Sequence, residues 1–139
     1  MNKYTAANIP SPCYVLDEGL LRNNLELMQR VQQQSGADII LALKGFAMWS
    51  AFPIVREYLK GCTASSVWEA RLAAEEFGRE VHAYAPAYKQ EDIDALLPLV
   101  NHISFNSVAQ WQRYQEQAAA AGVSMGLRIN PEHQEAETE

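Results

Sequence analysis

Short apolar segments alternate with helix-forming segments along almost the whole chain. Residues 39–43 are apolar without a break, which is typical of a strand that is buried on both faces of a parallel sheet. Strands are also expected at residues 11–17, 62–64, 81–85, 102–105 and 125–129. Helices are expected between Asp17 and Gly36 and at residues 50–60, 66–77, 91–99 and 107–121. This alternation predicts an α/β fold with a parallel sheet and right-handed crossovers.

Two architectures fit this alternation, and periodicity alone does not separate them. One is an open, doubly wound sheet, and the other is part of a (β/α) barrel. No glycine-rich GxGxxG or GxxxxGK[ST] motif follows any expected strand. The sequence therefore gives no support for a dinucleotide site or a P-loop.

Composition excludes several classes of protein. The 139 residues carry a formal charge of −6, and four of the acidic residues lie at positions 132–139. Such a chain lacks the basic surface of a nucleic-acid-binding protein. No apolar run is long enough to span a membrane, and the first residues lack the apolar region of a signal peptide. Cys13 and Cys62 stand far apart, so we expect two buried thiols in a reducing cytoplasm and no metal site.

Lys44 is the residue that most clearly suggests chemistry. It comes directly after the apolar strand and before Gly45. In parallel α/β folds the carboxyl ends of the strands carry the active site. A lysine there can act as an amine nucleophile. The alternative is a lysine that extends into solvent at a strand end.

Several segments around these positions resemble the fold-type III pyridoxal phosphate enzymes, the group of alanine racemase and the ornithine, arginine and diaminopimelate decarboxylases. ILALKGFA, at residues 40–47, is similar to the first barrel strand with its cofactor lysine. The other similar segments keep the order of the group: PCYVLD at 12–17, TASS at 63–66, YAPAYK at 84–89, SFNS at 104–107 and LRINP at 127–131.

The longer segments LKGFAMWS (43–50), TASSVWEARLA (63–73) and GLRINPEH (126–133) resemble the carboxynorspermidine/carboxyspermidine decarboxylases. This resemblance implies a partial (β/α)8 TIM barrel with an N-terminal strand and about five barrel strands. It implies a pyridoxal 5'-phosphate-dependent carboxy-lyase that forms norspermidine or spermidine in polyamine biosynthesis. A polyamine substrate and a homodimer of the full-length protein are implied as well.

The resemblance also implies roles for single residues. Lys44 would form the Schiff base with the cofactor, and Arg128 would lie near the phenolic oxygen of the cofactor. Ser65 and Ser66 would line the cofactor pocket, although Ser66 equally suits a helix N-cap. Related decarboxylases have an acidic residue just before this segment, where this chain has Cys62 or Thr63. No acidic role is therefore carried over.

Two domain assignments follow from the resemblance. Residues 1–133 would form the N-terminal part of the cofactor-binding barrel, and residues 134–139 would be an acidic tail that fits no part of it. A (β/α)8 barrel needs about 250 residues, so the chain resembles a fragment that lacks the later strands and the C-terminal β-domain. Alone it is expected to be inactive and poorly stable, because its sheet edges are unpaired.

Two other readings stay open. The chain could derive from another fold-type III decarboxylase, of the diaminopimelate or ornithine type, or from a non-catalytic homologue. Among the remaining residues, the three histidines show no metal-ligand spacing and are assigned structural or surface roles. Three tryptophans are expected to pack helices against the barrel. These residues are His82, His102, His133, Trp49, Trp68 and Trp111.

Overall fold

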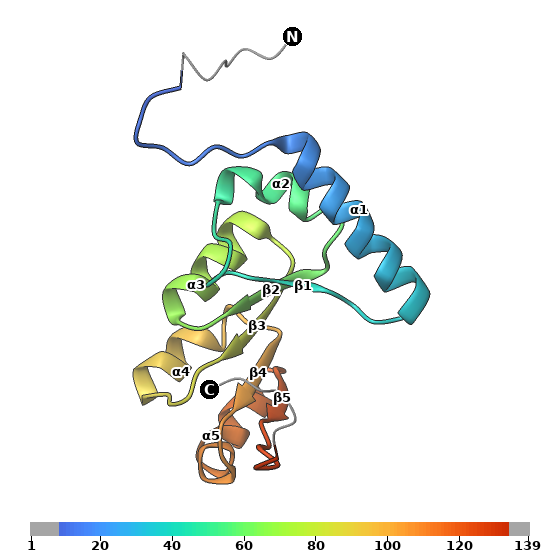
Figure 1. Ribbon diagram of the computed structural model, residues 1–139. Helices are drawn as coiled ribbons and strands as arrows, with labels where there is room; N and C mark the ends of the chain where they lie inside the picture. The colour runs from blue at the N-terminus through green and yellow to red at the C-terminus, as the bar shows by residue number, and fades with distance from the viewer. Residues whose placement is uncertain (1–8, 134–139) are drawn as a thin grey trace.

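The computed structural model describes residues 9–133 and shows one parallel sheet (Figure 1). Its five strands are hydrogen-bonded in the order β1-β2-β3-β4-β5, the same order as in the sequence. A doubly wound sheet reverses its strand order at a switch point, whereas a barrel adds each strand beside the last. The order therefore favours the barrel. The strands are β1 (Ile40–Ala42), β2 (Gly61–Ala64), β3 (Glu80–Tyr84), β4 (His102–Phe105) and β5 (Ser124–Leu127).

The connecting segments are helical and cover one face of the sheet. Figure 1 shows α3, α4 and α5 along one side of the strands. The helix before the sheet is α1 (Glu18–Ser35). The connections are the 3-10 turn η2 (Trp49–Ala51) with α2 (Phe52–Val55), α3 (Val67–Leu72) with the π-helical turn η3 (Ala73–Phe77), α4 (Gln90–Leu96) and α5 (Val108–Ala120).

Helix ends follow the capping residues of the sequence. Asp17 is the N-cap of α1, and its side chain accepts a hydrogen bond from the Leu20 N–H at 3.0 Å. Gly36 ends this helix in the left-handed region with φ 72°. Ser66 and Ser107 cap α3 and α5 in the same way as Asp17 caps α1. These polar groups satisfy N–H groups that have no partner inside the helix.

Alternate residues of each strand face the helices and form the core. Cys62 and Ala64 of β2 are buried, as are Val81 and Ala83 of β3. The residues between them belong to the opposite face, which is more polar: Thr63, Glu80, His82, Tyr84, His102 and Ser104. This period of two follows from the pleat of a strand. One face of the sheet is thus packed on helices, and the other presents polar side chains.

Two expected elements differ in the structure. Residues 11–17 form no strand, because none of the described residues pairs with them, and Tyr14 is 98% exposed. The helix expected at residues 50–60 is limited to a 3-10 turn and four α-helical residues. Pro53 favours a helix start but supplies no N–H group. The following residues form turns that lead into β2.

The tryptophans and cysteines are only partly where the sequence placed them. Trp49 and Trp68 are exposed, so the expectation that they pack helices against the barrel is wrong for both. Trp111 is half-buried and packs against the core, as expected. Cys62 is buried, but Cys13 is exposed, so only one of the two thiols is protected.

The two thiols are expected to differ sharply in reactivity. Burial raises the pKa of the Cys62 thiol to about 12, so it carries almost no thiolate near neutral pH. Cys13 is exposed. Iodoacetamide at pH 8 should therefore label Cys13 in the native chain and label Cys62 only after unfolding in urea. Mass spectrometry of the labelled peptides measures this, and equal labelling rates in the native chain would contradict the packing around Cys62.

Candidate functional site at the carboxyl edge of the sheet

Lys44 lies in the turn that ends β1. The neighbouring Leu43 is 2% exposed and anchors the turn in the core, whereas Lys44 is exposed. The Gly45 N–H donates to the Ala42 carbonyl at 3.0 Å, and the Phe46 N–H donates to the same oxygen at 3.1 Å. A buried residue and a closed turn therefore fix the backbone that carries the amine. Lys44 stands at the carboxyl edge of the sheet, where the sequence placed it.

Ser65 and Ser66 follow β2 at the same edge. The Ser65 N–H donates to Glu69 Oε2 at 2.6 Å, and Ser66 Oγ accepts from the Glu69 N–H at 3.2 Å. This reciprocal arrangement is a variant of a capping box. The cap alternative for Ser66 is therefore confirmed. Ser65 is exposed at the strand end.

Arg128 joins the edge from β5, together with two residues from β3 and β4. The Arg128 N–H donates to the Phe105 carbonyl at 2.9 Å and extends the ladder between β4 and β5. The guanidinium Nη1 donates to the Tyr84 hydroxyl, and its Cζ lies 5.3 Å from the centre of the Tyr84 ring. The Tyr84 hydroxyl in turn donates to Asn106 Oδ1 at 2.9 Å. The three side chains form one chain of contacts across three strand ends.

Tyr88 fixes the loop after β3. Its hydroxyl accepts from the Ala85 N–H at 2.8 Å and lies 3.4 Å from the Ser104 carbonyl oxygen. Its ring contacts Phe105 edge-to-face, with centroids 6.2 Å apart. Burial raises the pKa of the Tyr88 hydroxyl to about 12, so it stays protonated and can act as a donor. This tyrosine has a structural role beside the site.

Two histidines lie one layer below this edge on the polar face. The strand register aligns Ala42, Thr63, His82, His102 and Ser124 in one row. The two imidazole rings are 5.3 Å apart between centroids. His102 Nδ1 lies 3.1 Å from Ser124 Oγ, and its Nε2 lies 3.3 Å from Ser104 Oγ. Hydroxyls can donate or accept, so they suit a neutral imidazole with one donor and one acceptor nitrogen.

Gly126 makes room for this row. A Cβ atom at residue 126 would lie 3.0 Å from His102 Nε2 and 3.1 Å from Ser104 Oγ. Real Cβ contacts are rarely this short, so a side chain there would displace the histidine or the serine. The absence of a side chain on β5 therefore allows His102 to keep both hydroxyl contacts.

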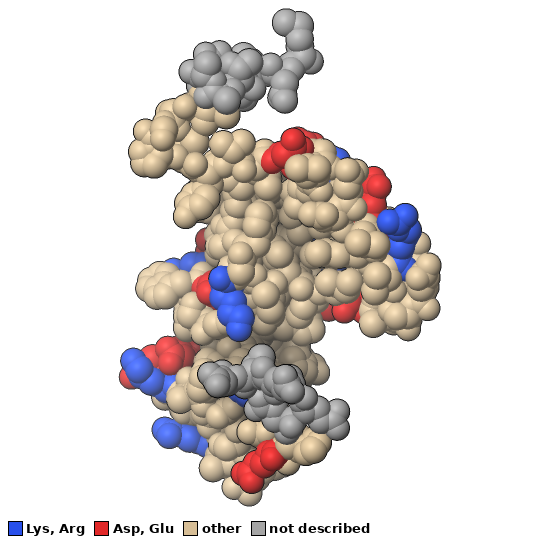
Figure 2. All heavy atoms as spheres, in the orientation of Figure 1, with Lys and Arg blue, Asp and Glu red and all other residues tan. Residues whose placement is uncertain are grey.

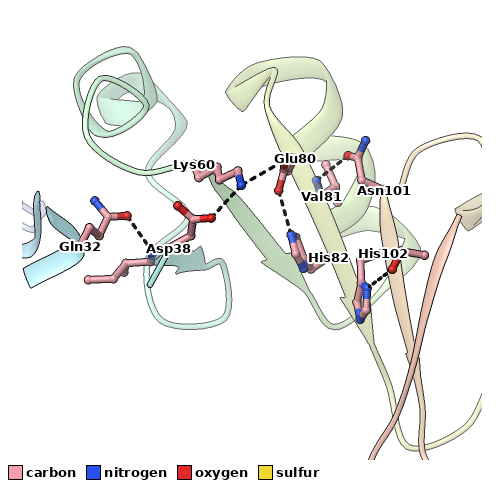
Figure 3. A network of polar contacts seen from close by, with 10 residues as sticks. Gln32, Asp38, Lys60, Glu80, Val81, His82, Asn101 and His102 are labelled. Carbon is pink, nitrogen blue, oxygen red and sulfur yellow. Dashed lines mark hydrogen bonds and ion pairs between the residues drawn. The ribbon is translucent and has the colours of Figure 1, made fainter. Parts of the chain in front are cut away.

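A line of charged side chains extends from the histidines toward the amino ends of the strands (Figure 3). His82 Nε2 lies 3.4 Å from Glu80 Oε2, and Glu80 Oε1 lies 3.7 Å from Lys60 Nζ. Lys60 also pairs with Asp38 at 2.7 Å. These groups are largely exposed, so each pair contributes little to stability. They lie at the end of the sheet opposite to Lys44 and Arg128.

The histidine row predicts a loss of stability in acid. Burial and, to a lesser extent, the neighbouring His82 lower the pKa of His102. As the pH falls through about 6.5, the unfolded chain takes up a proton on this residue that the folded chain resists. The free energy of unfolding should therefore fall between pH 7.5 and pH 5.5. His102→Gln should flatten this dependence in urea titrations.

Gln112→Ala serves as the control for this measurement, since Gln112 is exposed and carries no titratable group. It should leave the slope of unfolding free energy against pH close to that of the unsubstituted chain. An unchanged slope in His102→Gln would show that His102 has no lowered pKa.

The sequence placed Lys44 and Ser65 just after their strands, and the structure agrees. Arg128 was expected within a strand at residues 125–129, but β5 ends at Leu127, so Arg128 lies just beyond the strand. Sequence reasoning missed Tyr84 and Asn106 as companions of Arg128. It also missed the pairing of His82 with His102. One signal was available, because the two histidines stand at matching places in successive strands. The contacts of Tyr84 had no such signal, because they depend on side-chain reach across strands.

The described residues give no other obvious site. Among residues 9–133 no group of three or more His, Cys, Asp or Glu side chains could hold a metal ion. On the face drawn in Figure 2, acidic and basic side chains are scattered and form no basic patch. No helix in this part of the chain is both long and apolar enough to cross a membrane.

Comparison with known proteins identifies homologues for nearly the whole chain. No family model matches. A carboxyaminopropylagmatine decarboxylase from Synechocystis sp. is 53% identical over 133 residues, which cover 96% of this chain and 34% of that protein. A carboxynorspermidine/carboxyspermidine decarboxylase from Campylobacter jejuni is 48% identical over 124 residues, covering 89% and 32%. The enzyme of the same name from Herminiimonas arsenicoxydans is 40% identical over 123 residues, covering 88% and 33%.

Solved structures agree with these homologues. The crystal structure of carboxynorspermidine decarboxylase from Campylobacter jejuni, complexed with norspermidine, matches with a TM-score of 0.87 and 45% identity. The match covers 94% of this chain and 35% of that one. D-threonine aldolase from Filomicrobium marinum matches with a TM-score of 0.78 at 17% identity, which supports the fold alone.

The resemblance to carboxynorspermidine/carboxyspermidine decarboxylases is therefore confirmed, and so is the fold class. The five parallel strands match the N-terminal part of a fold-type III barrel enzyme. The chain spans about a third of the length of the curated relatives that it matches.

Proposed function

We propose that this chain is the N-terminal part of a pyridoxal 5'-phosphate-dependent decarboxylase that acts on a carboxylated polyamine. One observation carries the proposal: Lys44 lies in the turn that directly follows the first strand in a chain that is 40–53% identical to decarboxylases of carboxylated polyamines. The five strands and the extent of the matches fit the first part of a longer barrel. In this proposal residues 1–133 contribute to the cofactor domain, and the full-length protein is a homodimer of the cytoplasm.

The residues at the carboxyl edge fit this cofactor. It is an aldehyde with anionic oxygens, and the edge offers an exposed primary amine at Lys44 and a permanent cation at Arg128. Lys44 would hold the cofactor covalently. Arg128 would face an anionic oxygen, and Ser65 would line the pocket beside Lys44. When bound, the cofactor supplies the electron sink that allows carbon dioxide to leave.

Two substrate types fit the homologues. The Campylobacter and Herminiimonas relatives are named for carboxynorspermidine and carboxyspermidine, whereas the Synechocystis relative is named for carboxyaminopropylagmatine. The last relative is the most similar of the three, at 53% identity. We therefore propose a carboxylated polyamine as the substrate class and treat the agmatine derivative as the second candidate.

A chimera tests this function. Residues 9–133 would replace the corresponding segment of the Campylobacter decarboxylase, which is 48% identical. The chimera, loaded with pyridoxal phosphate, should release carbon dioxide from carboxynorspermidine, carboxyspermidine or carboxyaminopropylagmatine and not from diaminopimelate or ornithine. A chimera that folds and binds the cofactor but decarboxylates diaminopimelate instead would contradict the proposed substrate class. One that folds but binds no cofactor would contradict the proposed enzyme class.

A further inference from the structure

Arg128 has a fixed backbone but a long, exposed side chain. Its N–H completes the ladder to Phe105, so the strand sets where the side chain begins. An exposed arginine can adopt many rotamers, and holding one of them costs conformational entropy. Some contact must compensate for that cost if the guanidinium is to occupy one place at the sheet edge.

Tyr84 supplies two such contacts. Its hydroxyl accepts a hydrogen bond from Arg128 Nη1, and its ring lies under the guanidinium carbon at 5.3 Å. A hydrogen bond that involves a charged donor is stronger than a neutral one, and the ring face adds a cation–π attraction. Tyr84 thus contacts the guanidinium through its hydroxyl oxygen and through the face of its ring.

Asn106 fixes the direction of the tyrosine hydroxyl. A phenol has one proton to donate, and Tyr84 donates it to Asn106 Oδ1 at 2.9 Å. Its oxygen lone pairs are then left to accept from Arg128. Register places Tyr84 opposite Ser104 and Ser104 opposite Gly126, so Asn106 and Arg128 lie two residues further along the same face.

Among residues 9–133 the partners of Arg128 are neutral, and none of them compensates its charge. The ion pairs within residues 9–133 do not include Arg128. A carboxylate partner would hold the side chain equally well but would cancel the charge seen by a ligand. A tyrosine and an asparagine hold the guanidinium and leave its positive charge for an anion.

We propose that Tyr84 is a positioning residue, which, oriented by Asn106, holds the Arg128 guanidinium ready for an anionic oxygen of the bound cofactor. The inference rests on the proposed function for the identity of the anion. The placement of Arg128 by Tyr84 does not depend on it, so the two parts can be tested separately.

The first test needs no cofactor. In the cofactor-free chimera labelled with ¹⁵N-arginine, the Nε–H order parameter of Arg128 should fall in Tyr84→Phe, which keeps the ring and removes the hydroxyl. Tyr58→Phe removes a hydroxyl far from the site and should leave that order parameter unchanged. An equal Nε–H order parameter of Arg128 in Tyr84→Phe and in the unsubstituted protein would overturn the positioning role, independently of any result on cofactor binding.

The second test measures pyridoxal phosphate binding to the chimera that carries residues 9–133, by absorbance titration. Tyr84→Phe should weaken binding about tenfold, the scale of one hydrogen bond to a charged group. Arg128→Gln should weaken it at least as much. The double variant should bind no more weakly than Arg128→Gln alone, because Tyr84 acts through Arg128.

Additive losses in the double variant would show that Tyr84 acts on the fold and not through Arg128, which would overturn the inference. The same conclusion would follow if Tyr84→Phe bound the cofactor as well as Tyr58→Phe does. If the unsubstituted chimera folded but bound no pyridoxal phosphate, the proposed function would fail, while the arginine measurement would still decide the role of Tyr84.

Discussion

Lys44→Ala should abolish covalent attachment of pyridoxal phosphate and reduce decarboxylation by the chimera at least about 10³-fold. The amine at the end of β1 is the group proposed to hold the cofactor, and alanine offers no nucleophile. The fold should survive, because Lys44 is exposed and its turn is closed by backbone hydrogen bonds to Ala42. Turnover and the visible absorbance of the bound cofactor measure the effect.

Lys60→Ala is the matched control for this substitution. Lys60 also stands next to a strand, but at the opposite end of the sheet, where it pairs with Asp38 and Glu80. Its removal should leave cofactor attachment and turnover near those of the unsubstituted chimera. Full turnover in Lys44→Ala, or an equal loss in Lys60→Ala, would show that Lys44 has no special role.

Phe77→Ala should lower the free energy of unfolding by about 3–5 kcal/mol. Phe77 ends the helical segment after β2, is fully buried and packs edge-to-face on Phe52, with centroids 5.4 Å apart. The substitution removes this contact and leaves a cavity between α2 and the helix that follows β2. Because small domains are stable by only about 5–15 kcal/mol, a large part of the stability would be lost. Urea unfolding followed by circular dichroism measures it.

Trp68→Ala provides the comparison for this substitution. Trp68 is also a large aromatic residue on the helical layer, but it is 75% exposed and its ring faces Arg71. Its loss should change the unfolding free energy by no more than about 0.5 kcal/mol. A loss as large as that of Phe77→Ala would show that the burial pattern assigned to this layer is wrong.

The alternation of apolar strands and helices was enough to predict the parallel sheet. Each strand is a short apolar segment, and α1, α3 and α5 each begin at a recognisable capping residue. Gly36 and Ser66 stand at helix boundaries for reasons that are local in the chain. Strand order was not predictable in this way, since doubly wound sheets and barrels share the same alternation. It depends on how the crossovers pack in three dimensions.

Errors arose where a segment depends on a distant partner. Residues 11–17 have the composition of a strand, but a strand needs a neighbour to pair with, and the described residues provide none. The exposure of Trp49 and Trp68 has the same origin, because a large apolar residue does not by itself indicate which surface covers it.

The candidate site also contains residues that could be predicted from the sequence and residues that could not. Lys44 could be predicted from its place after an apolar strand, and Arg128 from the resemblance of its segment. Tyr84 and Asn106 could not, because their contacts with Arg128 require the register of three strands. The pairing of His82 with His102 had a partial signal in the places of the two histidines on successive strands, but only the strand register shows that they lie opposite each other.

The central claim is that Lys44 is the cofactor lysine, and borohydride reduction tests it most directly. The chimera that carries residues 9–133 would be incubated with pyridoxal phosphate, reduced with borohydride, digested and mapped by mass spectrometry. Residues 9–133 contribute Lys44, Lys60 and Lys89, so an adduct within this segment can be assigned to one residue. We predict that the reduced adduct lies on Lys44. An adduct on Lys60 or Lys89 instead, or one spread evenly over the lysines, would contradict the account.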